Sequence, residues 1–181
     1  MKLVIYILMT ISAATILHTY NNSEAKRIPA EFRPYYKKFL KLAEQYNADI
    51  NESPLTISFG KPTIDVDARD KGSIIWAQCT VDLPSFTKPR IIVDKKVWDS
   101  LNHLDREELM YHELGHCLLK QVHRDDSVND YPISIMHRRH MGYQKYAQHR
   151  EYYLKEMFLY GRVKVPVEMA GLQASQSANP Q

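Results

Sequence analysis

The amino-acid sequence predicts an α+β fold in a single globular domain. Two patterns indicate this class: short runs rich in alternating or β-branched residues, and amphipathic stretches at helical spacing before and after them. The length of 181 residues is typical of one domain. A composition of 44% hydrophobic and 25% charged residues is ordinary for a folded protein, and it excludes a wholly disordered or collagen-like chain.

Residues 1–25 are typical of an export leader. Lys2 is followed by a mostly apolar run, Leu3–Leu17, which is short for a membrane span of about 20 residues. Ser23 and Ala25 are small residues at the positions that a signal peptidase reads, so we expect cleavage after Ala25. The mature chain is then secreted or periplasmic and has no stable membrane span. The alternative is an uncleaved leader that anchors the chain in a membrane.

Residues 26–161 are expected to form the domain, and residues 162–181 a flexible tail, because the tail shows little periodicity. The first helix is predicted over Tyr35–Ala48, where apolar side chains recur near helical spacing and Pro34 fits the first turn. Residues 26–50 form either this first helix of the domain or a pro-segment.

Three short strands are predicted to follow the first helix. Leu55–Phe59 alternates between apolar and polar residues and ends at Gly60. Ser73–Val81 is rich in β-branched and aromatic residues, and Arg90–Asp94 is a short apolar run. Together these segments predict a small sheet.

Two helices are predicted in the second half of the chain. The first runs over Arg106–Leu119, and Asp105 with Glu108 resembles a capping box at its start. A loop separates it from a long helix over Tyr143–Leu159, which ends at Gly161.

The first of these helices carries the sequence His112-Glu113-Leu114-Gly115-His116. Histidines at positions i and i+4 lie on one helix face, so both imidazoles can reach one metal ion. Glu113 is rotated by about 100° from His112, which suits a base that acts on metal-bound water without binding the metal. A glycine inside a helix, such as Gly115, costs about 1 kcal/mol relative to alanine. Close approach of a strand or loop to the helix is one explanation for its presence.

This motif, with a later histidine and Ser134-Ile135-Met136, resembles the zinc metallopeptidases called metzincins, within the wider group of zincins. The resemblance covers Asp105 to Met136. It implies a zincin-like fold, in which a small mixed twisted sheet packs on the active-site helix between an N-terminal and a C-terminal helix. It also implies a methionine in a tight turn beneath the metal.

The ligands implied by the resemblance are His112, His116 and His123, holding one zinc per chain, with Glu113 as general base. His123 departs from the family pattern, since it follows His116 by seven residues rather than six and without an intervening glycine. A continuous helix would carry His123 about 10 Å along the axis, so the helix must end near Lys120 and the chain must turn back. The alternative third ligands are Asp125, Asp126, His137 and His140, or Glu151 or Glu156 as in the gluzincin branch.

Two further features bear on the site. Tyr143 lies downstream of the expected turn, where some relatives use a tyrosine to steady the oxyanion; packing at the start of a helix is the other explanation. Cys79 and Cys117 form an even pair in a chain expected to be exported, so a disulfide is predicted between the strand Ser73–Val81 and the motif helix. Two buried thiols are the alternative.

The sequence thus predicts an exported zinc metallopeptidase, a hydrolase that cleaves peptide or protein substrates with zinc-bound water as nucleophile. The edge of the strand Ser73–Val81 is expected, by analogy with the family, to pair with an extended peptide. A net charge of +3 without a dense basic block gives no indication of nucleic-acid binding. The alternatives are a non-catalytic exported protein that binds zinc or a partner on the same fold, and a metal-free adaptor with a surface histidine cluster.

Overall fold

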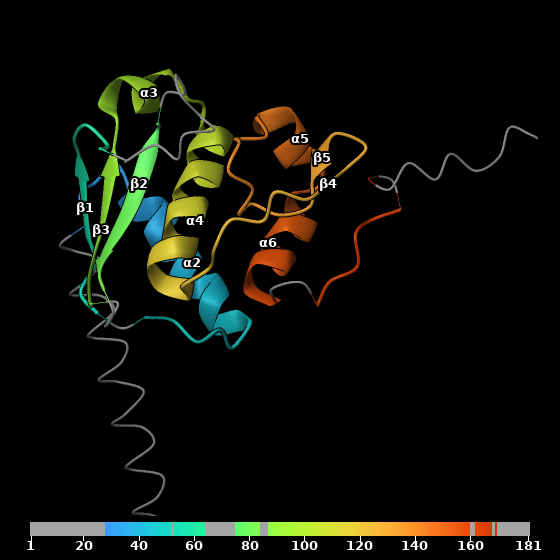
Figure 1. Ribbon diagram of the computed structural model, residues 1–181, viewed down its shortest axis with the longest axis horizontal. Coiled ribbons are helices and arrows are strands. Elements are labelled where there is room, and N and C mark those ends of the chain that lie inside the picture. The colour runs from blue at the N-terminus through green and yellow to red at the C-terminus, as the bar shows by residue number, and fades with distance from the viewer. Residues whose placement is uncertain are drawn as a thin grey trace, which may run out of the picture.

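The computed structural model describes residues 28–51, 53–63, 75–83, 87–159, 162–167 and 169. The expected leader lies outside these ranges. The fold is α+β, with helix α4 (His103–Leu119) at its centre (Figure 1). A three-stranded sheet covers one side of α4, and helices α5 and α6 with a small hairpin lie on the other side. The motif helix is therefore enclosed between two layers.

Helix α2 (Arg33–Gln45) packs against α4. Pro34 lies in its first turn, as expected, and Tyr36 and Phe39 are buried from one face. The helix ends three residues before the expected Ala48, because Asn47 adopts a left-handed φ of 49° and reverses the chain.

The sheet has the order β1-β3-β2, formed by β1 (Thr56–Phe59), β3 (Thr87–Val93) and β2 (Ala77–Asp82). Strand β1 pairs parallel to β3, and β2 pairs antiparallel to it, so the sheet is mixed. The expected first strand is confirmed over Thr56–Phe59. Strand β2 begins at Ala77, and the expected start at Ser73 lies outside the described residues.

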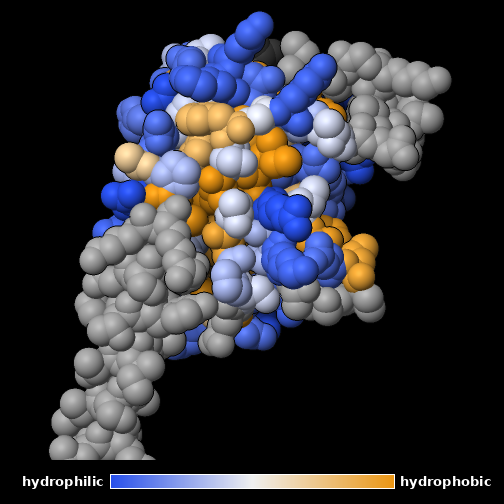
Figure 2. All heavy atoms as spheres, turned by 90° about the vertical axis from the view of Figure 1, so that its left-hand side faces the viewer, coloured by the Kyte–Doolittle hydropathy of each residue, from blue (hydrophilic) through white to orange (hydrophobic). Residues whose placement is uncertain are grey.

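The pairing register decides which side chains face α4. Cys79 lies opposite Ile91, which lies opposite Ile57, and the two isoleucines are buried. Because side chains alternate along a strand, this row faces the helix layer. The neighbouring rows face outward, and the side of the molecule seen in Figure 2 mixes apolar with charged side chains.

Strand β3 differs from its prediction at both ends. It starts at Thr87 and includes Pro89, which is tolerated because the pairing with β2 is irregular between Thr80 and Asp82. It stops at Val93, since Asp94 instead caps a short helix that was not predicted, α3 (Lys95–Ser100). The Asp94 carboxylate accepts from two backbone N–H groups of that helix.

Helix α4 begins three residues earlier than predicted. Asn102 is its N-cap, and Asn102 Oδ1 accepts from the backbone N–H groups of Leu104 (2.8 Å) and Asp105 (3.1 Å). The expected capping box at Asp105 and Glu108 is therefore wrong. Glu108 is buried in the second turn of the helix.

The C-terminal half differs most from its prediction. The expected loop contains a hairpin of β4 (Ser127–Val128) and β5 (Tyr131–Pro132), whose two turn residues both have positive φ. The expected single helix is divided at His149 into α5 (Tyr143–Gln148) and α6 (Arg150–Leu159).

The far C-terminal segment is described only in part. Met169 is buried, and its carbonyl accepts a hydrogen bond from Asn129 Nδ2 at 3.2 Å. The rest of the expected tail beyond residue 169 lies outside the described ranges. Each helix within those ranges is too short or too polar to cross a bilayer.

Glu107 joins four helices through one buried carboxylate. Its Oε1 accepts from Tyr146 of α5 (2.8 Å) and from Arg150 of α6 (2.5 Å), and its Oε2 accepts from Lys38 of α2 (2.7 Å). Donors from the two helices on either side of His149 thus meet at this carboxylate. Burial raises the pKa of Glu107, but these three hydrogen bonds outweigh it and leave the pKa below 4.5.

Glu107→Gln is expected to lower the free energy of unfolding by about 2 kcal/mol near pH 7, because it leaves the partly buried Arg150 and the half-exposed Lys38 without their counter-charge. A carboxyl group whose pKa is lower in the folded state contributes its full stability above the unfolded-state pKa. This contribution is lost as the pH falls through the folded-state pKa. The difference between wild type and variant should therefore shrink below the ordinary value of 4.5. Urea unfolding over a pH series measures this, with Glu44→Gln, at an exposed position of α2, as control. A difference that stays constant down to about pH 3 would contradict the network.

Candidate metal centre

Three histidine side chains converge beside α4. His116 Nε2 lies 3.1 Å from His112 Nε2 and 3.2 Å from His123 Nε2. A ligand nitrogen from each ring lies within 4.8 Å of the other two. Two nitrogen ligands about 2.1 Å from a shared zinc ion are typically a little over 3 Å apart, so these spacings fit one metal ion.

Backbone carbonyls fix the orientation of two of the rings. His112 Nδ1 lies 2.8 Å from the Ile135 carbonyl oxygen, and His116 Nδ1 lies 2.6 Å from the Gln121 carbonyl oxygen. A carbonyl only accepts, so both Nδ1 atoms carry the proton and both Nε2 atoms present lone pairs. These two lone pairs face each other at 3.1 Å with no hydrogen between them, an arrangement that a shared cation would make favourable.

The surroundings of the histidines disfavour a proton between the two Nε2 atoms. Burial, together with the neighbouring His116, His123 and His140, lowers the pKa of His112 to about 3, although its hydrogen bond to Ile135 acts in the opposite direction. Burial also lowers the pKa of His116. The rings are therefore neutral near pH 7, as metal-binding imidazoles are.

The turn that brings back His123 starts at Lys120. Lys120 adopts a left-handed φ of 55° and ends α4, and the backbone N–H groups of Lys120 and Gln121 both bond to the Gly115 carbonyl. Asn51 donates to the last carbonyls of the helix at Cys117 and Leu118. The expected helix end near Lys120 is confirmed, and a lysine takes the conformation that glycine usually takes there.

Ser134-Ile135-Met136 forms a tight turn beside the histidines. The Ser134 hydroxyl accepts from the Met136 N–H (3.1 Å), and the Ser134 carbonyl accepts from the His137 N–H (3.2 Å). The turn holds His112 through the Ile135 carbonyl. The Met136 side chain is fully buried against Gly115, where an added Cβ would lie 2.5 Å from Met136 Sδ. The glycine is thus explained by close approach of this loop.

Two tyrosines of α6 hold the segment that leads into this turn. Tyr153 donates to the Pro132 carbonyl (2.9 Å), and Tyr152 donates to the Ile133 carbonyl (2.7 Å). Sequence patterns did not reveal this support, because the tyrosine hydroxyls bond to backbone atoms about 20 residues away in the chain.

Glu113 lies on the buried side of α4 that faces strand β2. Its carboxylate accepts a hydrogen bond from the Cys79 backbone N–H. Burial raises the pKa of Glu113 to about 8, and the bond from Cys79 opposes that shift. The three grouped nitrogens all come from histidines, so the candidate ligand set does not include Glu113.

The alternative third ligands have other partners. Asp125 is paired with Arg138 (2.7 Å), and Glu156 is paired with Arg124. Glu151 is exposed and paired with Lys155 (2.8 Å). In the described part of the chain, the group that contains His112 and His116 is completed by His123, and not by the alternatives, which include Asp126 and His137.

His140 belongs to a second group with Asp105 and Glu108. Its Nε2 lies 3.0 Å from Glu108 Oε2, and its Nδ1 accepts from the Gly142 N–H at 3.1 Å. A neutral ring that accepts at Nδ1 carries its proton on Nε2, so His140 donates from Nε2 to the Asp105 carbonyl oxygen at 3.3 Å rather than offering a lone pair to a metal. The bond from His140 to the Asp105 carbonyl, and the bond from the Met141 N–H to Glu108 Oε1 (2.8 Å), fasten the loop after Met136 to α4.

The predicted disulfide is present between Cys79 and Cys117. It joins strand β2 to the residue that directly follows His116. The sequence separation is 38 residues, for which the chain-entropy model gives a stabilisation of about 4 kcal/mol. The alternative of two free thiols is wrong.

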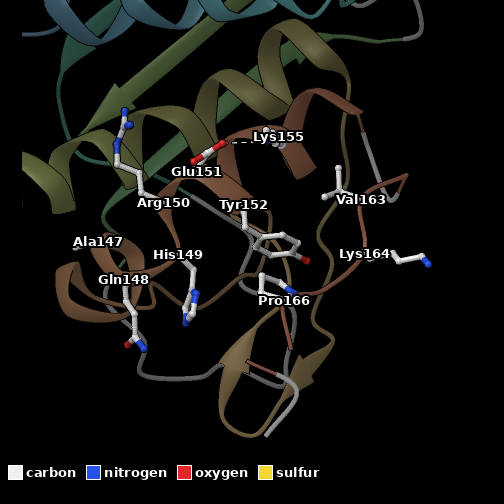
Figure 3. Close-up of a pocket in the computed structure, with 10 residues that line it drawn as sticks. All are labelled: Ala147, Gln148, His149, Arg150, Glu151, Tyr152, Lys155, Val163, Lys164 and Pro166. Carbon is white, nitrogen blue, oxygen red and sulfur yellow. Dashed lines mark ion pairs between the residues drawn. The ribbon is translucent and has the colours of Figure 1, made fainter. Parts of the chain in front are cut away.

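Two other features are not part of the histidine group. Tyr143 is the first residue of α5 and is half-exposed, and its hydroxyl accepts from Gln144 at 3.4 Å. A hollow of about 460 Å³ lies where α5 meets α6, beside the segment 163–166 (Figure 3). Its lining includes His149, Tyr152 and Pro166 but none of the three converging histidines.

Comparisons of the chain with protein-family models, with curated proteins and with solved structures found no match. What the site can do therefore follows from its own residues.

Proposed function

We propose that this protein is an exported zinc metallopeptidase with a zincin-like, metzincin-type active site. The observation that carries the proposal is the pair of Nε2 lone pairs of His112 and His116, which face each other at 3.1 Å beside His123. Only a shared cation makes that arrangement favourable, and three imidazoles suit zinc.

The ligands His112, His116 and His123 would hold the zinc ion and leave a position for water. Zinc bound in this way lowers the pKa of a coordinated water towards 7 and polarises the carbonyl of the scissile bond. The hydrogen bonds from His112 and His116 to backbone carbonyls keep their ligand nitrogens aimed at the shared position.

Glu113 is proposed as the general base. It follows a ligand directly in α4, which would place its carboxylate beside the metal position, and it stands outside the ligand set. It takes a proton from the attacking water and transfers it to the nitrogen of the departing amine. The Cys79 N–H holds the carboxylate in orientation for both transfers.

The substrate is proposed to be an extended peptide that pairs with strand β2. Among the described strands, β2 has a neighbour on one side only, and it crosses α4 beside Glu113. An open strand edge offers backbone donors and acceptors to a peptide, which favours recognition of main chain over one particular side chain.

Two measurements on the purified protein test this function. Elemental analysis is expected to give about one zinc per chain. The zinc-loaded protein is expected to cleave an unstructured protein such as casein, and removal of zinc by a chelator should abolish cleavage until zinc is restored. Protein that binds no zinc would contradict the metal centre. Protein that binds zinc but cleaves no peptide bond would favour the non-catalytic zinc-binding alternative.

A further inference from the structure

We propose that the Cys79–Cys117 disulfide positions the general base, so that its reduction slows peptide hydrolysis while zinc remains bound. This inference rests on the proposed function and adds a redox dependence to it.

Cys79 contacts α4 at two points that are one helical turn apart. Glu113 and Cys117 are separated by four residues, so their side chains leave the helix on the same face. Cys79 is bonded covalently to Cys117 through its sulfur, and its backbone N–H donates to the Glu113 carboxylate. One residue of β2 therefore links the disulfide directly to the base.

The zinc ligands are held by other parts of the fold. His112 is fixed by the Ile135 carbonyl, and His116 by the Gln121 carbonyl. His123 follows the turn at Lys120. Opening the disulfide therefore leaves the supports of the metal site unchanged.

Strand β2 depends more strongly on the bridge. It pairs with β3 on one side, and the disulfide is its covalent attachment to α4. After reduction, the pairing of residues 77–80 with β3 keeps β2 in the sheet. The sheet can then shift relative to the helix, and the Cys79 N–H loses its fixed position on Glu113.

The chemistry is a two-electron exchange. A phosphine reductant supplies two electrons, the two cysteine sulfurs each take up a proton, and the phosphine becomes its oxide with oxygen from water. Glutathione disulfide reverses the change: it accepts two electrons and two protons from the two thiols and yields two glutathione molecules. If the expected leader exports the chain, the bond forms only after export, in an oxidising compartment. Full activity would then appear at the destination.

The first test compares oxidised and phosphine-reduced protein in zinc-saturated buffer, well below the unfolding temperature. Reduction is expected to lower kcat about tenfold, within the effect of general-base catalysis, with zinc content unchanged. Glutathione disulfide should restore kcat. The control is the double variant Cys79→Ala/Cys117→Ala, which should have the lower kcat with and without phosphine, so that any effect of phosphine on zinc is detected separately.

The second test does not depend on activity. Hydrogen exchange is measured by mass spectrometry in both redox states. The Cys79 amide is expected to exchange faster after reduction, while amides of α4 keep their protection. Unchanged kcat with both thiols verified, loss of zinc on reduction, or equal loosening of α4 would each overturn the inference. If the oxidised, zinc-loaded protein cleaves nothing, the proposed function fails, and the exchange experiment still decides whether the bridge positions Cys79.

Discussion

Replacing Glu113 by Gln is expected to lower kcat by about 10³-fold and to leave zinc content at the wild-type level. The glutamine would keep the size of the side chain and an oxygen that accepts from the Cys79 N–H, so the local structure should persist. Its amide cannot take a proton from water. The measurement combines steady-state hydrolysis of a peptide with elemental analysis of the same sample.

A matched control is Glu151→Gln. Glu151 lies on α6, where its side chain is 83% exposed and paired with Lys155, so its loss should leave kcat and zinc content unchanged. If Glu113→Gln lost zinc together with activity, Glu113 would be a ligand. If it kept full activity, the base would be another group.

Replacing His123 by Ala is expected to weaken zinc binding by more than 100-fold, which exceeds the typical 10–100-fold cost of changing a residue that only supports a ligand. His123 is the most exposed member of the three, and its Nε2 lies 3.2 Å from His116 Nε2. Competition with a chromophoric chelator measures the dissociation constant directly.

The controls for His123 are four of the alternative third ligands. Asp125→Ala, Asp126→Ala, His137→Ala and His140→Ala should each weaken zinc binding by less than about tenfold, since a partial or indirect support costs at most the lower end of that range. His137→Ala is the closest match, because it removes the same side chain, and His137 Nδ1 accepts instead from the Arg139 N–H at 3.1 Å. A variant of this series that loses zinc while His123→Ala binds it normally would assign the third ligand elsewhere.

Local patterns of the sequence determined the α+β class, the motif helix and the position of two candidate ligands. His112 and His116 are four residues apart on a helix, and that spacing alone fixes their common face. The first strand and the first-turn Pro34 were predicted for the same reason: each depends on residues within one element. The pairing of Cys79 with Cys117 followed from there being only two cysteines.

Boundaries that depend on competition between neighbouring signals were less predictable. Asn102 and Asp105 are both good N-cap residues, and the structure uses Asn102. The residue pattern also favours a single helix that spans Tyr143–Leu159. The structure divides this segment at His149, and Tyr146 and Arg150 on either side of the break both bond to Glu107, a residue about 40 positions earlier.

Tertiary structure alone decided the third member of the histidine group. Nothing in the segment between His116 and His123 marks a reversal, since the left-handed residue is Lys120 and not glycine. The turn is held by backbone N–H groups that donate to the Gly115 carbonyl, by Asn51 of a distant loop and by the Gln121 side chain, which donates to the Met157 carbonyl of α6 at 2.6 Å. The sequence by itself therefore determined which residues can bind a metal, because that follows from side-chain type and helical spacing. Contacts between remote segments decided that His123 joins them, because a backbone conformation unfavourable for lysine persists only where its surroundings hold it in place.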